Sequence, residues 1–163
     1  MTADAPQMRV GHAYDIHRVS ADPDRRLVLG GVVFDGEPGL EGHSDADVVA
    51  HVCIDALLGA AGLGDIGQQF PPSDPALAGA DSVELLRTAV KRVRAAGWVP
   101  VNVDCTVVCD RPRLADTRQA MHSRLGEAVG APVTVKGRAS EGVGAIGRGE
   151  AIAAWAVALV TAS

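Results

Sequence analysis

Two short polar segments interrupt an otherwise aliphatic chain, and the side chains that they carry restrict the fold. The first segment ends in Asp15 and His17, and the second ends in His51. If the first segment is extended, Asp15 and His17 point to the same side, because side chains alternate along a strand. His51 falls on a helix predicted over residues 45–61. Two imidazoles and one carboxylate form a three-ligand zinc set that leaves one position for substrate. The strand end and the helix start must therefore lie side by side.

Length and composition favour one domain. The chain has 163 residues, of which 47% are hydrophobic and only 3% aromatic. Its core must therefore consist of Val, Leu, Ile and Ala, and this length suffices to bury one such core. The formal charge of -5 argues against a nucleic-acid partner and against an anionic membrane surface. Phosphate binding would have to come from local cations, metals or backbone amides.

The cysteines and the apolar runs suggest a compartment. Cys53, Cys105 and Cys109 include no C-x-x-C pair, and their number is odd, which is typical of a reduced protein. The N-terminus has no hydrophobic signal core, and the longest apolar run, Ala151 to Val160, is too short to span a bilayer. We expect a cytoplasmic protein without a membrane partner.

Hydrophobic periodicity predicts an α/β (α+β) fold. We expect a mixed sheet of about four main strands, covered on one face by three helices, plus a small β-hairpin. A disordered leader is expected over residues 1–8 and a single domain over residues 9–161. Strands are predicted over 9–16, 27–33, 101–108, 133–135 and 152–160. Helices are predicted over 45–61, from Asp81 to Gly97 and from Pro112 to Gly130.

Other polar residues allow two interpretations each. Asp47 and Asp55 lie one helical turn on either side of His51, so they either orient its ring as acceptors or are ordinary solvent-facing charges. Residues 136–144 place a Lys, an Arg and Glu141 among glycines, a composition that suits a phosphate cradle and a hard cation but also a surface turn. The glycines of residues 62–67 match the letters of a dinucleotide fingerprint, but they follow a helix rather than a strand, which excludes that function.

Together the motifs resemble those of the 2-C-methyl-D-erythritol 2,4-cyclodiphosphate synthase family of the non-mevalonate isoprenoid pathway. The matching motifs are Gly11-His12-x-x-Asp15-x-His17, His43-Ser44-Asp45-x-Asp47-x-x-x-His51, Leu63-Gly64-Asp65-Ile66-Gly67, Gly79-Ala80-Asp81-Ser82 and Gly147-Arg148-Gly149-Glu150. The resemblance implies cyclisation of 4-diphosphocytidyl-2-C-methyl-D-erythritol 2-phosphate with release of CMP. The substrate's own 2-phosphate would be the nucleophile, which agrees with the lack of a recognisable nucleophile motif.

The resemblance also implies roles for individual residues. It implies zinc at Asp15, His17 and His51, and Mg²⁺ or Mn²⁺ at Glu141. It implies a catalytic group of His43, Ser44, Ser140 and Glu141. The implied substrate-binding residues are Asp65, Ile66, Gly67, Phe70, Asp74, Cys109, Pro112, Arg113, Ala115, Arg138, Ala139 and Arg148. The implied partners are a small-molecule cytidine diphosphate substrate and two further copies of the chain, in a homotrimer with active sites at subunit interfaces.

Some positions depart from the family pattern. Ala139-Ser140 stands where the family usually has a Thr-Thr pair, Pro72 replaces a common acid, and Ala145 replaces a Phe that lines the trimer's central cavity. Two other functions stay open beside the cyclising enzyme. One is a metal-dependent phosphohydrolase that uses the same ligands to activate water. The other is a non-catalytic trimer that binds zinc or an isoprenoid.

Overall fold

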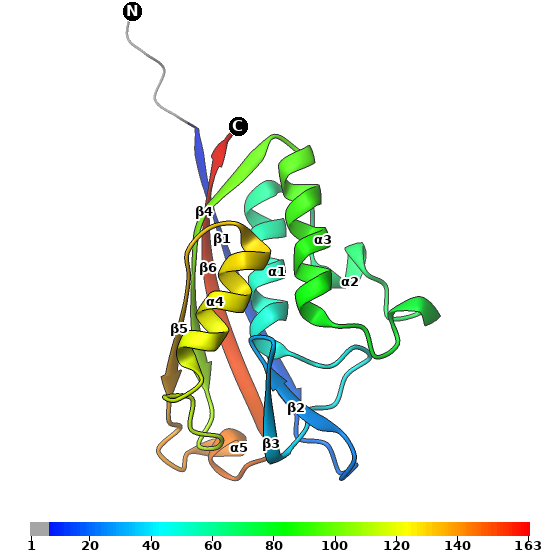
Figure 1. Ribbon diagram of the computed structural model, residues 1–163, viewed down its shortest axis with the longest axis vertical. Coiled ribbons are helices and arrows are strands. Elements are labelled where there is room, and N and C mark those ends of the chain that lie inside the picture. Colours follow the sequence, from blue (N-terminus) through cyan, green and yellow to red (C-terminus); the bar gives the residue numbers. More distant parts are fainter. Residues whose placement is uncertain (1–6) are drawn as a thin grey trace, which may run out of the picture.

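The computed structural model describes residues 7–163 and shows a sheet with helices on one side (Figure 1). Over these residues the strands are β1 (Met8–Arg18), β2 (Arg26–Leu29), β3 (Val32–Pro38), β4 (Trp98–Val108), β5 (Val133–Arg138) and β6 (Ala151–Ala162). The longer helices are α1 (Val48–Ala61), α3 (Ser82–Ala95) and α4 (Arg118–Val129). Shorter ones are α2 (Ile66–Gln69), α5 (Gly144–Gly147) and the 3₁₀ turn η1 (Pro75–Leu77).

The main sheet has four strands in the order β1-β6-β4-β5. β4 and β5 run parallel, whereas β6 pairs antiparallel with both β1 and β4. β1 and β5 are therefore the two edges of the sheet. Helix α1 packs on β1 and β6, α4 packs on β5, and α3 packs against both helices. The predicted fold class is confirmed, including the separate two-stranded hairpin β2-β3.

Helix α1 is the centre of the core. Most of its residues are buried, in keeping with its largely apolar sequence. It begins at the Asp47 N-cap, whose carboxylate accepts hydrogen bonds from the amides of Val49 (3.0 Å) and Ala50 (3.1 Å). The same carboxylate accepts from the amides of Gly30 (2.8 Å) and Gly31 (2.6 Å) in the hairpin turn. Asp47 thus joins the hairpin β2-β3 to the start of α1.

Strand β1 approaches α1 closely at Gly11. A Cβ atom at Gly11 would lie 1.9 Å from the carbonyl oxygen of Ala56 and 2.6 Å from the amide nitrogen of Ala60. No side chain fits there, so only glycine permits this packing. The approach places the C-terminal half of β1 beside the first turns of α1, where His51 lies.

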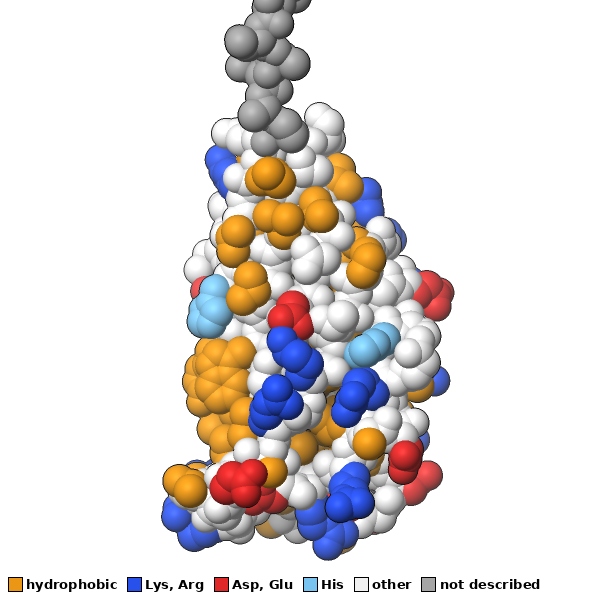
Figure 2. Space-filling model, turned by 90° about the vertical axis from the view of Figure 1, so that its left-hand side faces the viewer, with side chains coloured by type: hydrophobic (Ala, Val, Ile, Leu, Met, Phe, Trp, Pro, Cys, Tyr) orange, Lys and Arg blue, Asp and Glu red, His pale blue; other side chains and the backbone are white. Residues whose placement is uncertain are grey.

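The other face of the sheet has no helix over it within residues 7–163 (Figure 1). Figure 2 shows hydrophobic side chains gathered on this side of the molecule. The exposed ones on its strands are Met8, Val10, Tyr14, Ile16, Val101 and Val157. The Tyr14 ring also contacts the ring of Trp155, with 4.9 Å between centroids. Figure 2 also shows charged side chains and histidines between them, so the apolar side chains form separate groups on this side.

Some predicted boundaries were wrong. The strand expected over residues 27–33 is a hairpin, because Gly30 and Gly31 adopt positive φ and turn the chain between β2 and β3. The helix expected from Pro112 begins only at Arg118, with Thr117 as its N-cap. Residues 1–6 of the predicted leader lie outside the described residues, and Met8 already belongs to β1. None of the helices within residues 7–163 has the length and apolar character needed to cross a bilayer.

Replacing Gly11 by Ala is expected to lower the free energy of unfolding by about 1–3 kcal/mol or more, because the methyl group overlaps α1 backbone. Gly59 offers a matched control in α1, since a Cβ there meets no atom within 4 Å. Gly59→Ala should raise the free energy of unfolding by roughly 0.5–1 kcal/mol through helix propensity. Urea unfolding of both variants measures this, and a Gly11→Ala variant as stable as wild type would contradict the packing described.

Candidate metal centre and active site

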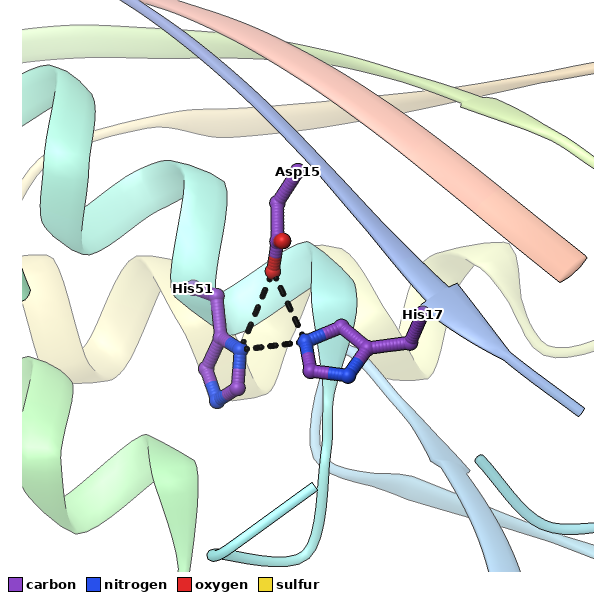
Figure 3. Close-up of side chains that lie close together, drawn as sticks. All are labelled: Asp15, His17 and His51. Carbon is purple, nitrogen blue, oxygen red and sulfur yellow. Dashed lines mark hydrogen bonds and ion pairs between the residues drawn. The ribbon is translucent and has the colours of Figure 1, made fainter. Parts of the chain in front are cut away.

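Three potential metal ligands meet where the end of β1 passes the start of α1 (Figure 3). The Oδ2 atom of Asp15 lies 3.0 Å from Nε2 of His17 and 3.1 Å from Nδ1 of His51. The two imidazole nitrogens are 3.1 Å apart. Asp15 and His17 alternate with the exposed Tyr14 and Ile16, so both point toward the helices. The convergence expected from the sequence is therefore present.

The arrangement fits a tetrahedral cation. Ligand atoms about 2.0–2.1 Å from a tetrahedral zinc lie roughly 3.3 Å from each other, close to the observed separations of 3.0–3.1 Å. Nδ1 of His17 lies 2.5 Å from the carbonyl oxygen of Glu41, which can only accept, so Nδ1 carries the proton. Nε2 of His17 then presents a lone pair to the carboxylate oxygen of Asp15. Such facing acceptors repel each other unless a cation or a proton lies between them.

The ionisation of this cluster reflects the same competition. Burial alone would raise the pKa of the Asp15 carboxyl, but hydrogen bonds and charge attraction from His17 and His51 outweigh it and hold that pKa well below its usual range. Burial alone would lower the pKa of His17, yet the Asp15 carboxylate outweighs it and raises that pKa. A metal ion and protons therefore compete for these atoms, and acidic pH should weaken metal binding.

The three side chains line a pocket of about 270 Å³ that also contains other predicted site residues. The remaining lining residues are His43, Ser44, Asp55, Ile66, Gly67, Phe70, Pro72, Leu77 and Leu85. Sequence reasoning named His43, Ser44, Ile66, Gly67 and Phe70 but missed the apolar wall of Leu77 and Leu85. Two further predicted residues adjoin the pocket: Asp65 is the N-cap of α2, and the carbonyl of Asp74 lies 3.2 Å from Nε2 of His43.

The loops around the pocket are held by long-range contacts. Arg25 donates to the carbonyl oxygens of Gly42 (2.9 Å) and Ser44 (2.7 Å), which fixes the segment that carries His43. Oδ1 of Asp55 accepts from the Ile66 amide (2.6 Å) and anchors the start of α2. The end of α2 is held by Arg92, which donates to the Gln69 carbonyl (2.8 Å) and lies over the Phe70 ring.

The other predicted substrate-binding residues lie at a different edge of the sheet. A second pocket, beside the ends of β4 and β5, is lined in part by Cys109, Pro112, Arg113, Ala115, Arg138 and Ala139. Next to it, Ser140 donates from its amide (2.6 Å) and its hydroxyl (2.7 Å) to Asp110. Glu141 is exposed and has a φ of 56°. Arg148 pairs with Glu150 at 2.6 Å and lines a third pocket, which Cys109 also lines.

Within one chain, the residues around Asp15, His17 and His51 lie far from those that line the second pocket. Asp15 pairs with Ala154, Ala154 with Val107, and Val107 with Gly137, so Asp15 and Gly137 lie level on opposite edge strands. Three strand spacings separate them by roughly 14 Å. The metal-site pocket and the second pocket share no lining residue. The sequence alone gave no indication of this separation, apart from the resemblance to a family with interface sites.

Comparison with known proteins agrees with the motifs. The model of the YgbB family matches residues 8–161. The chain belongs to the YgbB family. The 2-C-methyl-D-erythritol 2,4-cyclodiphosphate synthase of Symbiobacterium thermophilum is 52% identical to it over 156 residues, which are 94% of this chain and 98% of that protein. The resemblance predicted from the motifs is therefore confirmed.

Solved structures of related proteins share the fold of this chain. The bifunctional IspDF of Campylobacter jejuni is 36% identical with a TM-score of 0.91, and the match covers 98% of this chain but 43% of that protein. IspF of Plasmodium falciparum, solved as a CDP complex, is 30% identical with a TM-score of 0.82. That match covers 96% of this chain and 97% of the other.

The predicted partners of His51 need correction. Asp47 is fully buried and bonds backbone amides of α1 and the hairpin, so it neither orients the ring nor faces solvent. Asp55 holds the Ile66 amide instead. Nε2 of His51 lies 3.0 Å from the hydroxyl of Ser82 and 3.2 Å from that of Ser44. Sequence reasoning missed the contact with Ser82, because the two residues are 31 positions apart and only the packing of α3 against α1 joins them.

Replacing His51 by Ala is expected to abolish zinc binding while the protein still folds, because two ligands remain of three. His12 is a matched control: it lies on the same strand as Asp15 but is exposed on the other face of the sheet. His12→Ala should bind zinc as wild type does. Equilibrium dialysis with metal analysis measures this, and circular dichroism checks folding. Full zinc binding by His51→Ala would contradict the centre.

Proposed function

We propose that this chain converts 4-diphosphocytidyl-2-C-methyl-D-erythritol 2-phosphate into 2-C-methyl-D-erythritol 2,4-cyclodiphosphate and CMP, as a cyclising phosphorus–oxygen lyase of the non-mevalonate isoprenoid pathway. One observation carries the proposal. Three acceptor atoms from β1 and α1 converge on one point in a pocket, in a chain that is 52% identical to a synthase of this name. We place the reaction in the cytoplasm.

The chemistry is an intramolecular phosphoryl transfer. An oxygen of the substrate's 2-phosphate forms a bond to the β-phosphorus of the diphosphate. The bond from that phosphorus to the bridging oxygen breaks, and its electron pair stays on the phosphate of the departing CMP. The protein contributes no nucleophile, so its task is to hold the two groups in line and to neutralise charge. Such positioning is worth roughly 7–11 kcal/mol in well-oriented systems.

The residues divide this task among them. When bound at Asp15, His17 and His51, zinc would supply Lewis-acid polarisation of a diphosphate oxygen, and a Mg²⁺ or Mn²⁺ ion at Glu141 would neutralise further charge. We assign His43 and Ser44 to contacts with the phosphate and erythritol groups beside the triad. Asp65 and the Gly67 amide would contact the ribose. Phe70, Leu77 and Leu85 supply an apolar wall that limits water in the pocket.

We propose that the cytidine group binds the second pocket, which is lined in part by residues 109–115. Its loop offers backbone groups for base recognition, and Arg113 and Arg138 supply positive charge in an acidic protein. Ser140, held by Asp110, presents the hydroxyl next to Ala139 that could contact the phosphates. The CDP complex of the Plasmodium falciparum relative supports a cytidine diphosphate ligand.

We further propose a homotrimer with the active site shared between subunits. Two features support it. The face of the sheet without helices exposes apolar side chains that a partner copy would cover. The metal ligands and the cytidine pocket also lie on opposite edges of one sheet, roughly 14 Å apart. In a closed ring, the β1 edge of one subunit can meet the β5 edge of the next, which completes the site.

Product analysis tests the reaction. We expect the purified, zinc-loaded protein to convert the diphosphocytidyl substrate into CMP and a cyclic diphosphate in equal amounts, and chelation to stop the reaction. Phosphorus NMR with chromatography of the nucleotide measures both products. Inorganic phosphate in place of the cyclic product would instead show a phosphohydrolase. Absence of turnover together with zinc binding would show a non-catalytic binding protein.

Mixing two inactive variants tests the shared site. His51→Ala disables the metal centre, and Glu141→Ala disables the proposed site residues at the β5 edge. A homotrimer of either variant should be inactive. Trimers formed from an equal mixture of unfolded chains should recover roughly a quarter of wild-type activity. Each site needs an intact metal centre from one subunit and an intact Glu141 from its neighbour, and each condition is met in about half of the cases. CMP release after refolding together, compared with separate refolding, measures this. No recovery in mixed trimers would contradict the shared site.

A further inference from the structure

The His51 ring is held on its far side by a short polar chain that neither motif nor family resemblance assigned to it. Nε2 of His51 lies 3.0 Å from Oγ of Ser82, and Oγ of Ser82 lies 2.5 Å from Oδ1 of Asp45. Ser82 is fully buried and His51 is 7% exposed, so water does not compete for these bonds. The direction of the hydrogen bonds along this chain determines where His51 carries its proton.

The direction follows from counting donors and acceptors. An Asp45 carboxylate can only accept, and it already accepts from the amides of Ser82 (3.1 Å) and Asp47 (3.1 Å). The single hydroxyl proton of Ser82 is therefore donated to Asp45. Its oxygen is left with lone pairs facing Nε2 of His51, so that nitrogen must be the donor. Nδ1 of His51 then has a free lone pair directed at Asp15 and His17.

The neighbouring hydroxyl of Ser44 is compatible with this direction. Oγ of Ser44 accepts from the Ala46 amide at 3.2 Å and lies 3.2 Å from Oγ of Ser82. Ser44 can donate its proton to the oxygen of Ser82, which leaves Nε2 of His51 free to donate to Ser82. No carboxylate contact is found behind Ser44 among the described residues. Of these two hydroxyls, that of Ser82 is therefore the one whose orientation is fixed, by its hydrogen bond to Asp45.

We propose that Ser82 and Asp45 are positioning residues that hold His51 in its Nε2-protonated form, with Nδ1 ready to bind the metal. The inference rests on the proposed metal centre and adds two residues to it. Ser82 and Asp45 act on His51 as the Glu41 carbonyl acts on His17. Each imidazole is therefore oriented by a hydrogen bond to the ring nitrogen that faces away from Asp15. Partners of this kind raise the basicity of a ligand and limit the rotation of its ring.

Zinc affinity of the metal-free protein tests the proposal. Ser82→Ala should bind zinc 10–100-fold more weakly, and Ser82→Thr, which keeps the hydroxyl, should recover most of the affinity. Asp45→Asn should also weaken zinc binding. The Asn side-chain amide can donate a hydrogen bond to the Ser82 oxygen, and the Ser82 hydroxyl proton is then free to point toward Nε2 of His51. Thr88→Ala is the control on the same helix, since the Thr88 hydroxyl bonds only the Glu84 carbonyl. It should bind zinc as wild type does. Competition with a chromophoric chelator gives the dissociation constants.

The protonated nitrogen can be observed directly. Two-bond proton–nitrogen NMR correlation of the metal-free protein at mildly alkaline pH should show His51 protonated at Nε2 in wild type and as a tautomer mixture in Ser82→Ala. The signal is assigned by its loss in His51→Gln. Unchanged zinc affinity in Ser82→Ala, or an unchanged tautomer there, would overturn the proposal. Failure of the wild-type protein to bind zinc would instead refute the proposed metal centre.

Discussion

The packing of α1 against β1 is the constraint on which the rest of the structure depends. The three ligands come from these two elements, and they meet only because Gly11 lets the strand lie against the α1 backbone. The position of α1 is fixed a second time at its start, where Asp47 accepts amides from both the helix and the hairpin. A core of small and aliphatic side chains, such as Ala154 and Ala156 on β6, suits this close approach.

The candidate metal centre depends on which nitrogen of each imidazole carries the proton. Both imidazoles are bonded through the nitrogen that faces away from the centre, one to the Glu41 carbonyl and the other to Ser82. Each bond holds a ring in place and leaves lone pairs facing the Asp15 carboxylate. Such an arrangement is unfavourable by itself and becomes favourable when a cation enters. The orientation of the ligands thus resides in residues that do not themselves bind the metal.

The sheet order separates two groups of candidate site residues within one chain. β1 and β5 are separated by β6 and β4, so the three candidate metal ligands and the second pocket lie at opposite edges of the same sheet. Within residues 7–163 the helices cover only one face of the sheet, and the exposed apolar side chains on the other face are available to other copies. A closed ring would bury that face and join unlike edges in a single step. Oligomer formation and completion of the active site would then depend on the same contacts.

Local sequence determined much of this protein. The alternation of Asp15 and His17, the apolar run of α1 and the β-branched run of β4 each specify an element, because side-chain periodicity acts over a few residues. The motifs also indicated the family, and they named three side chains that the structure brings together. The roles of Asp47, Ser82 and Gly11 were decided only in the tertiary structure. Their long-range partners lie 16–49 positions away, and pairing over such distances depends on how whole elements pack rather than on neighbouring residues.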